Sequence, residues 1–566
     1  MQPICTPTRS TLLSGRYQIH TGLQHDIIQN GQDNAVDPEG RMELLPEAMR
    51  RAGLGTHMVG KWHAGFARES YCPWRRGFDT FVGYLSGCED YYHKTAGGAL
   101  DWWNGSQPAF FAPPEECPYW PGAPLAPNAS ARPECLGNYS ADVYVREAQR
   151  HIAAHAEGGA RASERMYLYL AMQSVHWPME APAWALRSVD PSLRDPWRRY
   201  YAAMAIAADA AVGQVVQALR AAGMWDDTLL VLSSDNGGMS GGYNGANSTC
   251  GGLNYPYRGW KDSLWEGGSR AVGMVKLPRA ARVADSKPLR GLFHVSDFLP
   301  TLFAAVGGDV ATLQPDIDGV DQYPALLRAA GLAPADATLG DTDEAARTAR
   351  DELLHNIDPL SYPVRAALRV GDLKVVIEGA GRPTWGWCDI NATEGGGLTN
   401  PCPLDLLLVT RGDEGELEAR ASRARAVANE VGWSGGGTPM LFNISTDPRE
   451  TDDLAGDPAW EPQLRALLER LTWHNSTAVP CRYPPVEPTF DPLATGVLGP
   501  FLPDVDAAGD AGDADDALGR PPTTTWPLAS VVVSRGGSGA ARSEAGGPPA
   551  AAGGAAAAAA AAAATE

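Results

Sequence analysis

Two stretches of the chain carry nearly continuous runs of apolar residues, the pattern of strands that are buried on both faces of a parallel sheet. They are residues 165–176, RMYLYLAMQSVH, and residues 227–238, DTLLVLSSDNGG. Between them, residues 199–223 place apolar side chains at helical spacing and end at Gly223, a residue type that commonly terminates helices. Strand, helix and strand in this order predict a βαβ unit and therefore an α/β fold.

Polar residues stand at the ends of both predicted strands. His176 ends the first run, and Asp235 and Asn236 follow the second. Ligand sites in open α/β sheets form at the carboxyl ends of the strands, so we expect these three side chains to meet in one site. Taken singly, each also has an ordinary structural explanation, since Asp-Asn-Gly-Gly is a good turn.

The first sixty residues predict a similar arrangement. A helix that begins near Pro7 would place the proline at its tolerated first turn and Cys5 just before it, where the helix dipole favours a thiolate. A second helix is predicted over residues 44–53. The segment GTHMVGKWH that follows predicts a short strand whose polar end carries Lys61 and His63.

Beyond about residue 346 the chain changes to short, alternating segments that predict a hairpin, one more strand and a helix. The last part is rich in Asp, Ala and Gly and includes ten consecutive alanines, so it lacks the large side chains of a core. We therefore predict a large, mixed but mostly parallel sheet sandwiched by helices, a smaller α+β domain with an antiparallel sheet, and a disordered tail. The corresponding ranges are residues 1–345, 346–502 and 503–566.

Composition narrows the possible functions. The 566-residue chain has a formal net charge of -21, which argues against a nucleic-acid-binding protein, because such a protein needs a basic face. No run of about eighteen large apolar residues occurs, so we expect no membrane span.

Two features favour the secretory pathway. If Cys5 is set aside, eight of the nine cysteines remain, an even number that could form disulfide bonds. N-glycosylation sequons are also present, although chance alone would give several. No signal peptide precedes Cys5, so the chain is either cytosolic or lacks its true N-terminus. The sequons lie at Asn104, Asn128, Asn138, Asn247, Asn391, Asn443 and Asn475.

Taken together, the polar positions are more informative than any one of them. They comprise a potential nucleophile, cations for oxyanion oxygens, an Asp/Asn pair suited to a hard divalent metal, and histidines that exchange protons near neutral pH. This combination predicts a site for an anionic substrate. Its members are Cys5, Arg9, Lys61, His63, His176, Asp235, Asn236 and Lys261.

The segment CTPTRSTLLSGR, which begins at Cys5, resembles the C-x-P-x-R signature of the type I sulfatases, with Ser14 where family members usually carry threonine. The resemblance extends through GKWH, SVHWP, SSDNGG, RGWKDSLWEGGSR and LFNISTDPRETDDLA, and so covers residues 1 to about 502. Further stretches, among them RRGFDTFVGYLSGCEDYY and DPLATGVLGPF, are similar to the arylsulfatase B branch of N-acetylgalactosamine-4-sulfatases. The family resemblance implies an alkaline-phosphatase-like fold.

The same resemblance implies a role for each polar residue. A formylglycine-generating enzyme oxidises Cys5 to formylglycine, whose hydrate is the nucleophile and is held by Arg9. Residue 5, Asp235 and Asn236 bind calcium. Lys61 and His63 line the side of the nucleophile, whereas His176 and Lys261 bind the sulfate and help the leaving oxygen depart; Lys61 also contacts the substrate.

One part of the family pattern lies outside this sequence. Family members carry an Asp-Asp pair several dozen residues before the cysteine, and these carboxylates complete the calcium site. With Asp235, Asn236 and residue 5 alone, the ion would lack several of its usual six to eight oxygens. We therefore expect weak calcium binding and low activity from this chain, and we interpret the early cysteine as the mark of an N-terminally truncated sequence.

Three functions remain open on sequence grounds. The first is a calcium-dependent sulfatase of the secretory pathway, extracellular or in a lysosome or vacuole, that acts on a sulfated sugar or an aryl sulfate. The second is a phosphate or phosphonate ester hydrolase on the same fold, and the third is a catalytically silent protein that binds sulfated glycans. For a sugar substrate, aromatic residues near the site are candidates for stacking on the ring: Tyr91, Tyr92, Trp102 and Trp103.

Overall fold

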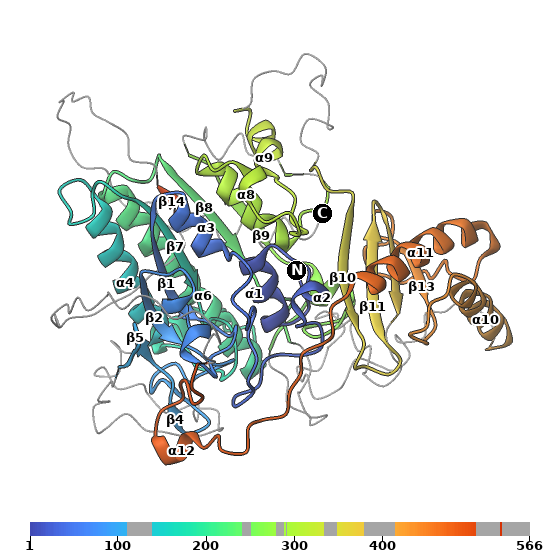
Figure 1. Cartoon of the computed structure of the whole chain (residues 1–566), viewed down its shortest axis with the longest axis horizontal. Helices are drawn as coiled ribbons and strands as arrows, with labels where there is room; N and C mark the ends of the chain where they lie inside the picture. The colour runs from blue at the N-terminus through green and yellow to red at the C-terminus, as the bar shows by residue number, and fades with distance from the viewer. Residues whose placement is uncertain are drawn as a thin grey trace, which may run out of the picture.

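The computed structural model describes residues 1–109, 139–239, 251–278, 288–289, 291–332, 348–377, 414–504 and 533–534. Its centre is an eight-stranded sheet with helices on both faces, as Figure 1 shows. The strand order is β6 (Gln107–Pro108), β5 (Trp103–Asn104), β2 (Thr80–Tyr84), β1 (Leu54–Lys61), β7 (Arg165–Ala171), β14 (Val533–Ser534), β8 (Thr228–Ser233) and β9 (Gly273–Lys276).

Strand β1 is the centre of the parallel part of this sheet. It pairs in parallel with β2 on one side and with β7 on the other. Near its carboxyl end, Gly60 has φ of 98°, and a Cβ atom there would lie 2.1 Å from the carbonyl oxygen of Ala171. Only glycine allows this approach, which brings the β1 and β7 backbones together immediately before Lys61.

The side chains of the sheet alternate between two apolar cores, so each face is covered by helices. In β7, Tyr167 packs into one core and Leu168 into the other. The first core includes residues of α1 (Cys5–Ser14), α3 (Leu45–Arg51), α8 (Phe298–Ala305) and α9 (Tyr323–Ala329). The second includes residues of α4 (Ser140–His155), α5 (Ala183–Ser188) and α6 (Pro196–Ala221). This layered architecture confirms the predicted α/β fold.

Strand β14 lies between β7 and β8 and runs antiparallel to both. Val533 is paired with Tyr167 on one side and with Leu229 on the other, and Ser534 is paired with Thr228. Strands β7 and β8 are therefore parallel to each other, as the βαβ prediction requires, but they are not direct neighbours. The predicted disordered tail comprises residues 503–566. Apart from Pro503, Asp504 and Val533–Ser534, it lies outside the described residues, so its disorder stays a prediction.

A second, antiparallel sheet lies beside the first (Figure 1). Its strands are β10 (Glu352–Asp358), β11 (Arg365–Val370), β12 (Leu373–Ile377) and β13 (Met440–Asn443). The predicted hairpin is β11–β12, which turns at Gly371 with φ of 56°. Helices α10 (Glu414–Glu430) and α11 (Glu461–Thr477) share an apolar core with this sheet. The predicted domain boundary near residue 345 lies outside the described residues and stays a prediction.

The two sheets are joined by a buried ionic triad. The Nζ atom of Lys374, on β12, lies 3.0 Å from Glu266 Oε1 and 2.8 Å from Glu450 Oε1. Glu266 begins α7 (Glu266–Ser269), which follows the Lys261 segment, and all three side chains are buried. Two carboxylates that share one buried ammonium ion fix the second sheet against the edge of the first.

The smaller elements complete the described chain. They are α2 (Gln18–Thr21), α12 (Pro492–Thr495) and the two-stranded pair β3 (Thr95–Ala96) and β4 (Ala99–Leu100). By length and composition, α6 is the one helix of the described chain apolar enough to cross a membrane. This is weak evidence, because α6 also packs into the second core of the large sheet.

Four cysteines fall within the described residues, and all four are free thiols: Cys5, Cys72, Cys88 and Cys481. The other five lie outside, so disulfide pairing stays a prediction. Of the seven sequons, three fall within the described residues: Asn104 and Asn475 are exposed and Asn443 is half-buried, and the remaining four lie outside.

Candidate active site

Helix α1 positions the proposed nucleophile and the arginine that follows it. Cys5 is the first residue of the helix and Arg9 lies one turn further on, so their side chains share a face. The guanidinium of Arg9 donates to the carbonyl oxygen of Lys61 at 2.7 Å and lies 3.3 Å from Asp235 Oδ2. Arg9 therefore ties α1 to two of the strand ends that the sequence singled out.

The strand ends converge as predicted. Lys61 is the last residue of β1 and His63 follows two residues later, while His176 comes five residues after the end of β7. Asp235 and Asn236 follow the last residue of β8. The carboxyl ends of parallel strands meet at one edge of the sheet, and α1 begins at that edge.

Cys5 is the point where these side chains meet. Its Sγ atom lies 3.3 Å from Lys261 Nζ and 3.8 Å from Asn236 Oδ1. The imidazoles of His63 and His176 lie near enough to Cys5 to help lower the pKa of its thiol. The structure thus brings the eight predicted positions together at one edge of the sheet, although their individual roles stay predictions.

The electrostatic environment favours an anion at residue 5. Burial alone would raise the pKa of the Cys5 thiol, but the nearby cations Lys261 and Lys61 and the hydrogen bonds from His176 and His63 outweigh it. The pKa of Cys5 is therefore lowered well below its usual value. A site that stabilises a thiolate at this position would also stabilise other anionic oxygen groups there.

The two lysines respond differently to the same surroundings. Burial lowers the pKa of Lys61, and Cys5 only partly opposes this effect. For Lys261, burial is outweighed by the negative charges of Cys5 and Asp235, and its pKa is raised. Of the two lysines, Lys261 therefore stays protonated to the higher pH.

The two histidines are held in defined hydrogen-bonding states. His63 Nε2 lies 3.2 Å from the carbonyl oxygen of Ile28 and must donate to it. The lone pair is therefore on Nδ1, which is buried and has no hydrogen-bond partner among the described residues. Burial and the charge of Lys61 lower the pKa of His63 to about 4. His176 Nδ1 likewise donates to the carbonyl oxygen of Trp177 at 2.8 Å, and burial lowers the pKa of His176.

Sequence reasoning missed several residues that hold the site together. The hydroxyl of Thr8 lies 2.7 Å from the carbonyl oxygen of Asp235, and the backbone N–H of Asp262 donates to the carbonyl oxygen of Pro3 at 2.6 Å. The side-chain amide of Asn254 hydrogen-bonds both backbone groups of Gly238. Its Nδ2 donates to the Gly238 oxygen at 2.9 Å, and its Oδ1 accepts from the Gly238 N–H at 2.8 Å. All are contacts between distant segments, which no local sequence signal reveals.

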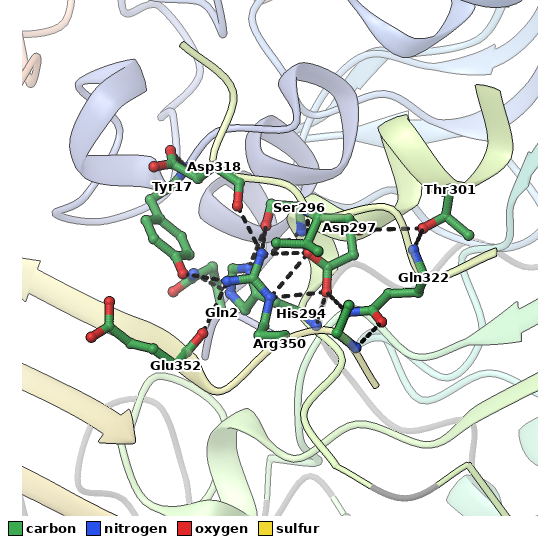
Figure 2. Close-up of polar contacts among 12 residues, drawn as sticks. Gln2, Tyr17, His294, Ser296, Asp297, Thr301, Asp318, Gln322, Arg350 and Glu352 are labelled. Atoms are coloured by element: carbon green, nitrogen blue, oxygen red, sulfur yellow. Dashed lines mark hydrogen bonds and ion pairs between the residues drawn. The ribbon is translucent and has the colours of Figure 1, made fainter. Parts of the chain in front are cut away.

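The segment before Cys5 is anchored to a polar network shown in Figure 2. Gln2 contacts His294 Nε2 at 3.2 Å, and the His294 backbone N–H donates to Asp297 at 2.9 Å. Asp297 is paired with the buried Arg350, which also donates to Tyr17 OH at 2.7 Å. Because the backbone N–H of Gln2 also donates to the hydroxyl of Thr8, this network stabilises the entry into α1.

The aromatic residues predicted to stack on a sugar are not available for it. Tyr91 and Trp102 are fully buried and Trp103 is 6% exposed, while Tyr92 is half-buried against the second core. Trp102 stacks on Tyr144 and lies under the ammonium group of Lys94. The stacking prediction is therefore wrong for these positions. The exposed aromatic residues near the site are Trp177 and Tyr255, which are 47% and 44% exposed.

The side chains present do not make a complete calcium site. Asp235 and Asn236 offer oxygens, but Asp235 is already paired with Arg9. Within the described ranges, no three His, Cys, Asp or Glu residues are grouped so as to hold a metal ion. Calcium takes about six to eight oxygen ligands, so these residues alone fall short and no reaction step is assigned to the ion here.

A layered α/β sheet with a potential nucleophile at a helix N-terminus, flanked by two lysines, an arginine and two imidazoles, defines a hydrolase that acts on an anionic ester. The chain belongs to the sulfatase family, whose profile matches residues 1–308. The family's reaction class is the hydrolysis of sulfate esters, which confirms the resemblance found in the sequence.

The similarity to curated relatives extends beyond the matched region. The chain is 32% identical to arylsulfatase J of Mus musculus over 519 residues, which cover 88% of this chain and 73% of that protein. It is 26% identical to N-acetylgalactosamine-6-sulfatase of Homo sapiens over 355 residues, 58% of this chain and 57% of the relative. The arylsulfatase B branch named from the sequence stays a prediction.

Solved structures agree on the fold. The crystal structure of Ps i-CgsB in complex with k-i-k-neocarrahexaose has a TM-score of 0.58 and 19% identity, and covers 86% of this chain and 85% of that one. PsFucS1 sulfatase from Pseudoalteromonas sp. has a TM-score of 0.52 and 18% identity, with 84% and 81% coverage. These likenesses confirm the alkaline-phosphatase-like architecture.

Proposed function

We propose that this chain hydrolyses sulfate esters of sugars through a formylglycine formed from Cys5. The observation that supports this most strongly is the surroundings of the Cys5 Sγ atom, which lies 3.3 Å from Lys261 Nζ and 3.8 Å from Asn236 Oδ1 in a cationic environment that lowers the pKa of the thiol. Here the sulfur stands in for the oxygen atoms of the modified residue. When formed, the hydrated aldehyde supplies one hydroxyl to attack the ester sulfur and a second to expel sulfate.

His63 is suited to accept the proton of the attacking hydroxyl. Its Nδ1 atom carries the lone pair, because Nε2 donates to the carbonyl oxygen of Ile28. Its pKa of about 4 keeps the ring neutral at mildly acidic and neutral pH, so the base is in the required state. Arg9, held by Lys61 and Asp235, lies on the same face of α1 and orients the nucleophile.

His176 and Lys261 act on the substrate side. Lys261 stays protonated because its pKa is raised, and so it offsets charge on the sulfate oxygens. In His176, Nδ1 already donates to Trp177, so Nε2 carries a transferable proton only when the ring is protonated. The protonated form then gives this proton to the leaving alcohol oxygen as the sulfur–oxygen bond breaks. Lys61 is the second lysine that places positive charge beside the sulfate.

The nature of residue 5 is tested by mass spectrometry and turnover together. Peptide mass across Cys5 in protein from its native host distinguishes the thiol from the lighter aldehyde, and 4-nitrophenyl sulfate reports hydrolysis. We expect the aldehyde and slow turnover in the wild-type protein, and neither in Cys5→Ala. A phosphate ester used in parallel separates a sulfatase from a phosphatase. Protein that carries only thiol but still turns over sulfate would contradict the proposed nucleophile.

Cys5→Ser provides a sharper test of the two-hydroxyl requirement. The serine oxygen would attack the sulfur and release the alcohol, but it has no second hydroxyl with which to expel the sulfate. We expect at most one turnover and a protein heavier by one sulfate group. Continued turnover by this variant would exclude the proposed role of the hydrate.

We further propose that this chain binds calcium weakly and is impaired for that reason, since Asp235 and Asn236 supply few of the oxygens needed. Calorimetric titration of calcium into the chain, with Asp235→Asn as the control, measures this affinity. Dissociation constants in the submicromolar range would overturn the proposal. The predicted partner is formylglycine-generating enzyme, which the chain would meet in the secretory pathway on its way to the cell exterior, lysosome or vacuole.

A further inference from the structure

An exposed aromatic residue lies on the segment that delivers Lys261 to the site. Tyr255 is 44% exposed and follows Asn254, whose amide is hydrogen-bonded to Gly238. The backbone N–H of Lys261 donates to the same residue, at the carbonyl oxygen of Gly238, at 3.2 Å. Because Gly238 lies two residues after Asn236, Tyr255 is held at the rim of the active site and not on a remote surface.

An arginine from the second sheet covers this tyrosine. The guanidinium of Arg449 lies 5.4 Å from the centre of the Tyr255 ring, and Nη2 lies 3.4 Å from the Tyr255 hydroxyl oxygen. Arg449 is exposed, and no carboxylate of the described chain pairs with it. Several other exposed arginines are neutralised by acidic partners, as in the pairs Arg50–Asp79, Arg51–Glu43 and Arg75–Glu69.

The backbone next to Arg449 is built to direct this side chain outward. Glu450 adopts a left-handed conformation with φ of 57°, which is unfavourable for a residue other than glycine. Its side chain is buried, where it pairs with Lys374 at 2.8 Å and accepts from the backbone N–H of Glu266 at 2.7 Å. Glu450 thus anchors the turn inside the molecule while its neighbour Arg449 extends over Tyr255.

We propose that Tyr255 and Arg449 form a subsite for the sugar next to the one that carries the reacting sulfate, and that Arg449 binds a second anionic group on that sugar. The proposal rests on the proposed function. The exposed part of the Tyr255 ring suits the apolar side of a sugar ring. The guanidinium that covers the other part has no carboxylate partner in the described chain and suits a sulfate or carboxylate. In a chain with a net charge of -21, attraction of a polyanion depends on such local cations.

The test compares substrates with one and with several negative charges. For a chondroitin 4-sulfate tetrasaccharide, Arg449→Ala is expected to raise KM roughly fivefold with kcat unchanged, the effect of one exposed charge contact of about 1 kcal/mol. For 4-nitrophenyl sulfate, neither constant should change. Arg449→Lys keeps the charge and should recover part of the loss, and added salt should reduce the difference between the variants.

A second cation–aromatic pair provides the matched control. Arg220 lies 5.1 Å from the ring centre of Trp225, beside the amino end of β8 and therefore at the edge of the sheet away from the site. Arg220→Ala removes the same charge and should change neither substrate's KM. An equal loss in both variants would show a nonspecific effect of net charge and would overturn the subsite.

The outcomes separate this inference from the proposed function. If the wild-type protein does not turn over 4-nitrophenyl sulfate, the hydrolase proposal fails. Calorimetric binding of the same tetrasaccharide to the wild-type protein and to Arg449→Ala then still tests the subsite. If turnover is normal but Arg449→Ala binds and cleaves the tetrasaccharide as well as the unmodified protein does, the subsite is excluded. Loss of the aryl sulfate reaction in Arg449→Ala would also contradict it.

Discussion

Strand β7 is paired differently on its two sides, and we call these two connections its joints. With β1, seven residues of β7 are paired in register, from Leu54↔Arg165 to Gly60↔Ala171. Towards β8, the connection passes through β14, where Val533 pairs with Tyr167 and Leu229. The first joint is a continuous backbone ladder, whereas the second depends on few main-chain contacts.

The active site spans both sides of the weaker joint. Lys61, His63 and His176 follow strands on the continuous side, whereas Asp235, Asn236 and Lys261 lie on or beyond β8. What connects the two groups is a set of side-chain and loop contacts centred on α1. Polar contacts therefore fix the geometry of this site where backbone pairing between strands is sparse. Single side-chain changes there should have large effects.

The largest expected effect comes from Arg9, because its guanidinium contacts both sides of the joint. Arg9→Ala removes the contacts to Lys61 and Asp235 and leaves the carboxylate without its cation. We expect a loss of kcat/KM of about 100-fold or more and a loss of roughly 1–3 kcal/mol in the free energy of unfolding. Steady-state kinetics and urea denaturation measure the two effects. Activity within threefold of the unmodified protein would show that Arg9 does not connect the two groups.

The pH profile of the reaction should follow the histidines, which lie on the continuous side. Activity is expected to fall below about pH 4, where His63 becomes protonated, and to fall again above the lowered pKa of His176, where its proton is lost. The optimum therefore lies between about 4 and 6.5. Initial rates on 4-nitrophenyl sulfate from pH 3 to 8 check this, and a profile that is flat up to pH 8 would remove His176 as the proton donor.

Folding stability should respond to the same protonation in a fixed direction. The pKa of His63 is about 4 in the folded chain and near 6.5 when unfolded, so the unfolded chain binds more protons between these values. The contribution of His63 is complete above about pH 6.5 and is lost as the pH falls towards 4. Thermal unfolding of His63→Asn should show a weaker dependence on pH over this interval than the unmodified protein.

Thr8→Val tests the contact of Thr8 across the weaker joint with little change in shape. It removes the hydrogen bond from the Thr8 hydroxyl to the carbonyl oxygen of Asp235 and the contacts of the same hydroxyl with the backbone of Gln2. We expect a loss of about 1 kcal/mol in stability and a fall of up to about tenfold in kcat. Ser10→Ala is the control, because the Ser10 hydroxyl bonds only within α1, to Pro7. Equal effects of the two variants would argue against a special role for the cross-joint contact.

The smallest effect is expected from truncation after Asp504, which removes β14. Strand β14 contributes the pairing of only Val533 and Ser534, so the change in Tm should stay within about 2 °C. Differential scanning calorimetry of the two forms measures it. A decrease of 6 °C or more would mean that the tail stabilises the sheet far more than its pairing suggests.

The sequence revealed those parts of the fold that follow from local pattern. The apolar runs of β7 and β8 and the helical spacing of α6 are local periodicities, and each predicted element is present. The cysteine signature and the polar residues at strand ends correctly indicated which side chains meet. Gly60 lies at the same strand ends, where its lack of a side chain allows the close approach to Ala171.

What the sequence could not reveal depends on contacts between distant segments. Trp102 was a reasonable candidate for sugar stacking until the packing of Tyr144 and Lys94 against it was known. The pair of Tyr255 and Arg449 brings together residues almost two hundred positions apart, from different sheets. The run of valines at 531–533 is compatible with a strand, but nothing local in the sequence places it between β7 and β8.

The buried triad of Lys374, Glu266 and Glu450 has a practical consequence for protein engineering. Its members come from three separate stretches of the chain, and removal of Lys374 leaves two carboxylates without their shared cation in a region closed to water. A chimera that exchanges the second sheet between family members must therefore transfer all three residues as a set. A graft that splits them would be expected to misplace the loop that follows β13 and the loop that carries Lys261 at the same time.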